Sequence, residues 1–124
     1  MKKPSIPTLR RKLDKVFSFF IRRRDSCLDD DVGECVTCHR AIFRLNGHAG
    51  HFIKRQFLAT RYDERNCHLQ CVHCNLYRGG ALIEYTLYMQ KRYGQETVDE
   101  LMRLKRTTVK YTRADYEEMI ARYS

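Results

Sequence analysis

The sequence has no tryptophan, no internal repeat, no low-complexity tract and no long apolar run. The apolar stretch near the start, 16–21, is followed at once by three arginines and predicts neither a signal peptide nor a membrane span, which needs about 18 apolar residues. We therefore expect a cytoplasmic protein without membrane contact. In such a reducing compartment, paired cysteines indicate metal binding before disulfide bonding.

A hydrophobic fraction of 43% in 124 residues predicts one domain over 1–124 with a modest core. A domain of this size buries a smaller share of its surface than a large one, so a metal or a cross-link would stabilise it.

The formal net charge is +9, and nine basic residues lie in the first 24 positions beside a single acid. Thr8, after Pro7, is a suitable N-cap for a basic amphipathic helix over 8–24. Its apolar residues recur with helical spacing: Leu9, Leu13, Val16, Phe17, Phe20 and Ile21. The apolar face favours docking on the domain or on a second copy. The basic face favours a polyanionic partner, with a merely solvated surface as the alternative.

The rest of the chain predicts an α+β fold. Residues 35–80 are turn-rich and favour a β-hairpin that runs into a helix. Residues 81–124 are predicted to form a helical extension, whose first helix ends at Gly94. Thr97 with Glu100 predicts a capping box for a further helix, and Thr112 with Asp115 does the same for the last one.

Two CxxC pairs, Cys35 with Cys38 and Cys71 with Cys74, are separated by 32 residues. Each pair presents two thiolates along one edge of a tetrahedron, so two pairs predict a closed structural Zn²⁺ site. Its binding free energy would add to the folding free energy. Four cysteines make the adjacent histidines, His39 and His73, unnecessary as ligands. Cys27 and Cys67 remain as buried or incidental thiols.

Between the pairs lie His48, His51 and Asn66, and Asn75 directly follows the last cysteine. A histidine, an asparagine five residues before the third cysteine and an asparagine after the fourth are the order of HNH, or ββα-metal, nucleases. Among these, the sequence resembles the phage NinG recombination proteins through the blocks FSFFIRRRD, CVTC, AGHFI, YDERN and HLQCVHCN, followed by Gly79-Gly80 through Tyr85. The resemblance covers roughly residues 8–94.

The resemblance implies that His51 is a general base, that Asn75 is a ligand of a catalytic Mg²⁺ or Mn²⁺, and that Asn66 ties the hairpin loop so that His51 points at the water. Phosphodiester hydrolysis needs such a base and a cation that stabilises the developing charge. A neutral imidazole serves as a base near pH 7.

The sequence departs from the usual HNH pattern before the base, where most members have aspartate and this chain has Gly50. Nucleases similar to phage endonuclease VII place an aspartate three residues before the base, and His48 occupies that position here. His48 with Asn75 is therefore the expected catalytic metal pair. Two neutral ligands hold Mg²⁺ weakly, and imidazole favours Mn²⁺, which predicts more cleavage in Mn²⁺.

Basic residues in and beside the motif are candidates for phosphate contacts, with Arg78 preferred. The predicted DNA-binding set is Arg10, Arg11, Lys54, Arg55 and Arg78. His68 and His73 are expected at the surface or behind the site, without an assigned role. Tyr85, Met89 and Tyr93 favour a core face over a base-stacking platform.

The expected function is a metal-dependent HNH endonuclease acting on branched DNA recombination intermediates, such as a Holliday junction or D-loop, in a phage or prophage setting. Branched DNA is recognised through shape and phosphate position, and symmetric cutting would suit a homodimer. Two alternatives remain: a non-catalytic zinc-dependent DNA-binding or recombination-accessory protein, and an RNA nuclease or toxin-like nuclease. An ordinary HNH enzyme that nicks duplex DNA is a variant of the expected function.

Overall fold

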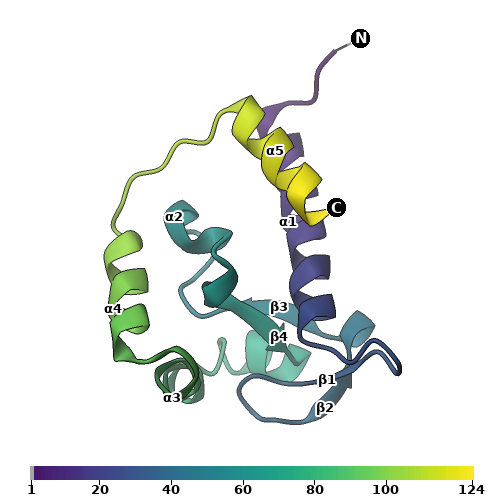
Figure 1. Ribbon diagram of the computed structural model, residues 1–124, viewed down its shortest axis with the longest axis vertical. Helices are drawn as coiled ribbons and strands as arrows, with labels where there is room; N and C mark the ends of the chain where they lie inside the picture. The colour runs from purple at the N-terminus through teal and green to yellow at the C-terminus, as the bar shows by residue number, and fades with distance from the viewer. Residues whose placement is uncertain (1) are drawn as a thin grey trace.

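The computed structural model describes residues 2–124 and confirms a mixed α+β fold (Figure 1). In chain order the elements are α1 (Ile6–Arg24), β1 (Val32–Glu34), β2 (Ala41–Phe43), η1 (Arg44–Asn46), β3 (His48–His51), α2 (Leu58–Arg61), η2 (Glu64–Asn66), β4 (Cys67–Gln70), η3 (His73–Tyr77), α3 (Leu82–Tyr93), α4 (Gln95–Leu104) and α5 (Arg113–Tyr123). No helix among these residues has the length and apolarity that crossing a bilayer requires.

The β structure consists of two separate antiparallel pairs, β1 with β2 and β3 with β4. In the second pair, His48 lies opposite Gln70 and His51 opposite Cys67. The connection between β3 and β4 carries α2 and η2, so it is longer than a tight hairpin turn. The sheet region predicted for 35–80 is therefore present, and it begins slightly earlier, in β1.

Helix α1 begins at Ile6, so the prediction that Thr8 is its N-cap is wrong. The Ser5 hydroxyl caps the helix by accepting a hydrogen bond from the Thr8 backbone N–H at 3.3 Å. Pro7 lies in the first turn, where its missing N–H is not needed. Both Ser5 and Thr8 have side chains suited to capping, and the actual start adds two residues to the basic helix.

The predicted apolar stripe of α1 faces the core. Its four buried residues are Leu9, Leu13, Phe17 and Ile21. They pack against α5 and the β3–β4 pair, and Figure 1 shows α5 lying along α1. The Phe17 ring contacts Tyr62 and Tyr123 edge-on, with centroids 5.6 and 4.9 Å apart. One face of α1 is thus committed to this chain, and its basic residues lie on the others.

A second core lies on the other side of the β3–β4 pair, where α3 and α4 pack together. Tyr85 and Met89 are buried there as predicted, whereas Tyr93 is only partly buried. Gly94 ends α3 and caps the start of α4, so Thr97 lies inside α4 and its predicted capping box is wrong. The capping box of Thr112 on α5 is confirmed.

Candidate metal centre and adjacent cavity

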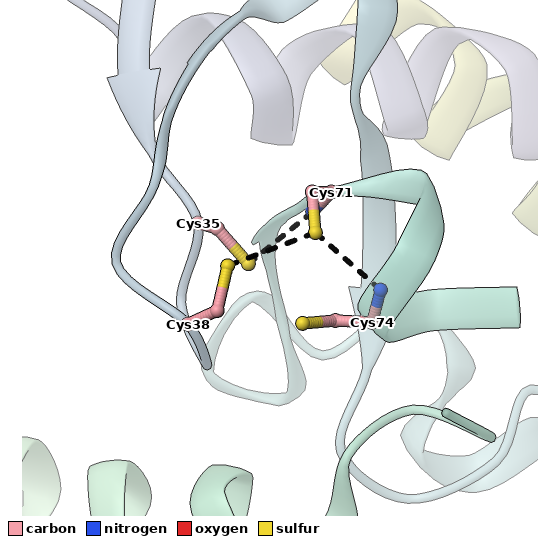
Figure 2. A group of neighbouring side chains, drawn as sticks. All are labelled: Cys35, Cys38, Cys71 and Cys74. Atoms are coloured by element: carbon pink, nitrogen blue, oxygen red, sulfur yellow. Dashed lines mark hydrogen bonds between the residues drawn. The ribbon is translucent and has the colours of Figure 1, made fainter. Parts of the chain in front are cut away.

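The four paired cysteines meet in one cluster, with all four sulfur atoms within 4.8 Å of one another (Figure 2). The Sγ atoms of Cys38 and Cys71 are 3.8 Å apart. A tetrahedral zinc ion with Zn–S bonds of about 2.3 Å requires an edge of about 3.8 Å. The cluster therefore fits a metal ion such as zinc, as the CxxC spacing predicts.

Backbone N–H groups support the cluster. The N–H of Cys71 donates to Cys35 Sγ at 3.3 Å, and the N–H of Cys74 donates to Cys71 Sγ at 3.4 Å. Burial raises the pKa of the Cys35 thiol, but backbone hydrogen bonds from Cys38 and Cys71 outweigh this effect. Together they lower the pKa of Cys35 to about 6, which favours the thiolate. Burial raises the pKa of Cys71 to about 12. A cation would be needed to hold all four groups as thiolates.

The other cysteines and the adjacent histidines lie outside this cluster. Cys27 is exposed and Cys67 is buried, in line with their assignment as incidental or buried thiols. His39 is exposed and contacts Glu34 through Nδ1 at 2.8 Å. His73 is exposed and stacks on Tyr77. Within residues 2–124, no second group of three or more cysteine, histidine or acidic side chains is close enough to share an ion.

Next to the cluster is an open cavity of about 390 Å³. Its walls come from α1, from β3 and the segment after it, and from η3. It is lined by Asp14, Phe17, Ser18, His48, Ala49, His51, Lys54, Arg55, Asn75 and Leu76. Three of the four residues to which the sequence assigns catalysis or catalytic metal binding thus share one solvent-connected space.

The imidazole of His51 is held by the backbone. Its Nε2 lies 3.0 Å from the carbonyl oxygen of Arg61, which can only accept a hydrogen bond. Nε2 therefore carries the proton, and Nδ1 is left as the basic nitrogen. Burial, together with the charges of Arg55 and Arg61, lowers the pKa of His51 to about 4 despite the hydrogen bond to Arg61. The ring is neutral at pH 7.

His48 and Asn75 contact each other across the cavity wall, with Asn75 Nδ2 donating to His48 Nδ1 at 2.9 Å. Gly50, the residue before His51, faces the interior instead. A Cβ atom placed there would lie 2.0 Å from Oε1 of the fully buried Gln70. An aspartate at this position would therefore force the buried Gln70 side chain to move, in keeping with the departure from the usual motif.

Asn66 is fully buried and ties the loop between β3 and β4. Its Oδ1 accepts from the N–H of Ile53 at 2.8 Å, and its Nδ2 donates to the carbonyls of Ile53 and Thr60 at 3.0 and 3.1 Å. These bonds join the chain just after His51 to the chain just before Arg61, whose carbonyl holds the imidazole.

Asp14 is a cavity residue that the sequence reasoning missed. Its carboxylate accepts from Arg61 through Nε and Nη2, at 3.0 and 2.5 Å, from Arg55 at 3.0 Å and from the Tyr62 hydroxyl at 2.7 Å. It is the single acid among the first 24 residues, and that isolation was the available signal. Asp14 fixes the side chain of the residue whose carbonyl orients His51.

His68 was expected at the surface or behind the site, and the surface assignment is wrong because the residue is only 3% exposed. Its Nδ1 and Nε2 lie 2.9 and 2.8 Å from the hydroxyls of Tyr85 and Tyr93. The Tyr85 hydroxyl donates to the carbonyl of Gly50 at 2.7 Å. Burial lowers the pKa of His68 to about 4. The network supports β3 immediately before His51.

The predicted DNA-binding residues do not all meet at the cavity. Lys54 and Arg55 line it, whereas Arg78 pairs with Glu84 at 2.5 Å and lies near Cys74 Sγ. Arg10 bonds the Tyr116 hydroxyl and Arg11 bonds Thr8, and neither of them lines the cavity. Arg78 does not line the cavity, and its role as a phosphate contact stays a prediction.

Comparison with known proteins identifies relatives of the chain. The family model described as Bacteriophage Lambda NinG protein matches residues 3–124. The protein NinG of Escherichia phage 933W is 36% identical over 94 residues, that of Escherichia phage lambda 35%, and that of Salmonella phage P22 34%.

Each of these matches covers 73% of this chain but only 42–43% of the relative. The matched part of the chain thus spans less than half the length of these curated relatives. No solved structure matches it.

Proposed function

This chain belongs to the NinG family of bacteriophage proteins, and we propose that it is a metal-dependent HNH-type DNA endonuclease. In this proposal His51 is the general base, His48 and Asn75 hold the catalytic ion, and the cysteine cluster holds a structural zinc. The substrates are branched DNA recombination intermediates in the cytoplasm of an infected host cell. The observation that carries the proposal is the orientation of the His51 imidazole in the cavity that His48 and Asn75 also line.

The chemistry follows from the tautomer of His51. Because Nε2–H donates to the Arg61 carbonyl, Nδ1 accepts a proton from a water molecule in the cavity. The resulting hydroxide attacks phosphorus and the bond to the 3′ oxygen breaks. This oxygen takes a proton from solvent water, so the products carry a 5′-phosphate and a 3′-hydroxyl. A bound divalent cation would stabilise the charge that develops on the phosphate and the leaving oxygen. Lys54 and Arg55 supply positive charge at the same cavity.

The spacing of His48 and Asn75 suits one octahedral ion. Two ligand atoms at about 2.1 Å from an ion and at right angles to each other are about 3.0 Å apart. The separation between His48 Nδ1 and the Asn75 amide is 2.9 Å. A half-turn of the amide would present Oδ1 in place of Nδ2. This pair would recruit Mn²⁺ more readily than Mg²⁺, because one ligand is an imidazole and neither is charged.

Asn66 acts in this proposal as a positioning residue and does not touch the substrate. Its three hydrogen bonds fix the loop that connects His51 to Arg61. Because general-base catalysis depends on a donor–acceptor distance of about 2.6–3.2 Å, a small shift of this loop would misplace Nδ1.

A second candidate is a non-catalytic, zinc-dependent DNA-binding or recombination-accessory protein. It is favoured by the uncharged metal pair and by the packing of Gly50 on Gln70, where the usual acidic ligand would displace the Gln70 side chain. In that case the cavity would bind a phosphate without hydrolysing it.

An assay with a labelled four-way junction, the corresponding linear duplex and an RNA of the same sequence decides between these functions. We expect the protein to nick the junction in Mn²⁺ and His51→Ala to lower the rate by about 10²–10⁴-fold, the usual contribution of a general base. His39→Asn is the matched control, because His39 is exposed, outside the cavity and at positive φ (65°), which asparagine tolerates.

Junction binding by both proteins without nicking by either would favour the accessory function. Faster cleavage of RNA would favour an RNA nuclease, and equal cleavage of duplex and junction an ordinary nicking enzyme.

A further inference from the structure

Three side chains of η3, one of which lines the cavity, are exposed although two of them are large and hydrophobic. Leu76 is 60% exposed and Tyr77 is 81% exposed. His73 is also exposed, and its ring stacks on Tyr77 with centroids 6.0 Å apart and planes 29° apart. We call His73, Leu76 and Tyr77 the rim ridge. Their exposure cannot stabilise this chain through burial, which points to contact with another molecule.

The rim ridge belongs to the element that joins the metal cluster to the cavity. All three residues lie on η3, which also carries Cys74 of the metal cluster and Asn75 of the cavity. Leu76 itself lines the cavity. The turn that follows is held by Lys54, whose Nζ donates to the Gly79 carbonyl at 2.7 Å. A phosphate in the cavity would therefore lie beside Leu76, which Tyr77 follows directly on η3.

We propose that the rim ridge stacks on an unstacked DNA base next to the phosphate in the cavity, so that the protein selects the interruption of base stacking found at a branch point. This inference rests on the proposed function for the identity of the bound polymer. It adds the feature of the substrate that is recognised and the residues that recognise it.

The chemistry of the ridge favours DNA over a protein partner. Aromatic rings stack on the faces of bases without regard to sequence, and leucine side chains insert between base steps. The adjoining charged residues, Lys54 and the largely exposed Arg55, match a phosphate backbone. In an intact duplex each base face is covered by its neighbours, so the ridge would gain contact only where the stack is broken.

The test uses the full chain in a His51→Ala background, with 2-aminopurine placed at the branch point of a four-way junction or at the matching position of a linear duplex. We expect the protein to quench 2-aminopurine in the junction but not in the duplex. Tyr77→Ala should abolish the quenching and weaken junction binding about tenfold, while leaving duplex binding unchanged. Tyr77→Phe should retain both properties, since it keeps the ring. Leu45→Ala is the control, because Leu45 is similarly exposed (68%) but lies outside the cavity.

Equal loss of binding to junction and duplex in Tyr77→Ala, or no loss at all, would overturn the inference. So would a change in sedimentation from dimer to monomer in Tyr77→Ala without DNA, because the ridge would then serve self-association. The proposed nuclease activity fails separately, if the chain with His51 intact quenches 2-aminopurine and yet does not cut the junction.

Discussion

The cysteine cluster and the histidine cavity are neighbours, joined through Cys74 and Asn75, yet they are built in opposite ways. The cluster has four identical ligand types from two short local motifs, and three of the four are buried. The cavity is open, its candidate ligands are uncharged, and its walls come from α1, β3 and η3. A tetrahedral ion held by the cluster would have no free coordination position, whereas the cavity is open to solvent.

In the proposed function, this difference separates stability from reactivity in a small chain. A closed tetrahedral site adds free energy to folding and excludes solvent from the ion. Reaction requires an exchangeable ion and a base that is oriented without being saturated by hydrogen bonds. His51 meets the second condition because one ring nitrogen is bound to the Arg61 carbonyl and the other is left for a proton.

The largest expected effect comes from breaking the cluster. Cys71→Ser should remove bound zinc and leave the chain unfolded, because structural zinc contributes about 10–16 kcal/mol and a whole domain is stable by only about 5–15 kcal/mol. Metal analysis and far-ultraviolet circular dichroism would measure both effects. Cys27→Ser, at an exposed thiol outside the cluster, should keep about one zinc per chain. A folded, zinc-loaded Cys71→Ser protein would show that the cluster is dispensable.

The cysteine cluster and three residues of the cavity could be predicted from the sequence. A CxxC pair brings its thiolates together locally, so spacing alone nearly determines the geometry, and the four sulfur atoms do meet. The resemblance to HNH nucleases assigned His48, His51 and Asn75 to one site, and these three residues do line one cavity.

What the sequence did not reveal depends on contacts between distant segments. The pairing of Asp14 with Arg61 requires α1 to dock beside the loop after β3, and the helical pattern reports only the apolar face. The same limit applies to His68, whose burial depends on Tyr85 and Tyr93 from α3. The start of α1 was predicted wrongly for a different reason. Ser5 and Thr8 both have side chains that can cap a helix, and sequence preference does not separate them.

The second prediction concerns the tie between α1 and the cavity. Asp14→Asn should lower the free energy of unfolding by about 2 kcal/mol, because hydrogen bonds to charged groups are worth about 1.5–3 kcal/mol and Asn cannot pair with both arginines. It should also slow junction cleavage about tenfold by loosening the carbonyl that orients His51. Urea unfolding and cleavage rates test the two effects. Glu117→Gln, at an exposed carboxylate, is the control; unchanged stability in Asp14→Asn would contradict the role of this contact.

The third prediction tests whether the cavity holds an exchangeable ion. The unmodified protein should cleave about tenfold faster in Mn²⁺ than in Mg²⁺, and His48→Asp should narrow that ratio, because a carboxylate replaces the imidazole with a ligand that Mg²⁺ prefers. His39→Asp introduces the same charge change at an exposed site outside the cavity and should keep the original ratio. Equal rates in the two metals before mutation would count against His48 as a ligand.

The smallest expected effect is the part of the pH dependence of folding stability that comes from His51 in the cavity and not from the cysteine cluster. The pKa of His51 is lowered from 6.5 to about 4, chiefly by burial, so the unfolded chain binds a proton in this range that the folded chain does not. Folding stability must therefore fall as pH drops from about 6.5 toward 4, with a slope of at most about 1.4 kcal/mol per pH unit from this residue. The glutamine in His51→Gln cannot titrate, so the free energy of unfolding of this variant should fall less steeply. Between pH 6.5 and 5.5 the variant should lose about 1 kcal/mol less than the unmodified protein. Protonation of the cluster affects both proteins alike and cancels in the difference between their urea-unfolding curves.

The slopes of stability against pH should coincide for the two proteins above pH 7.5, where neither the folded nor the unfolded state binds a proton at His51. Parallel curves below pH 6.5 would mean that the imidazole is not buried as a neutral ring.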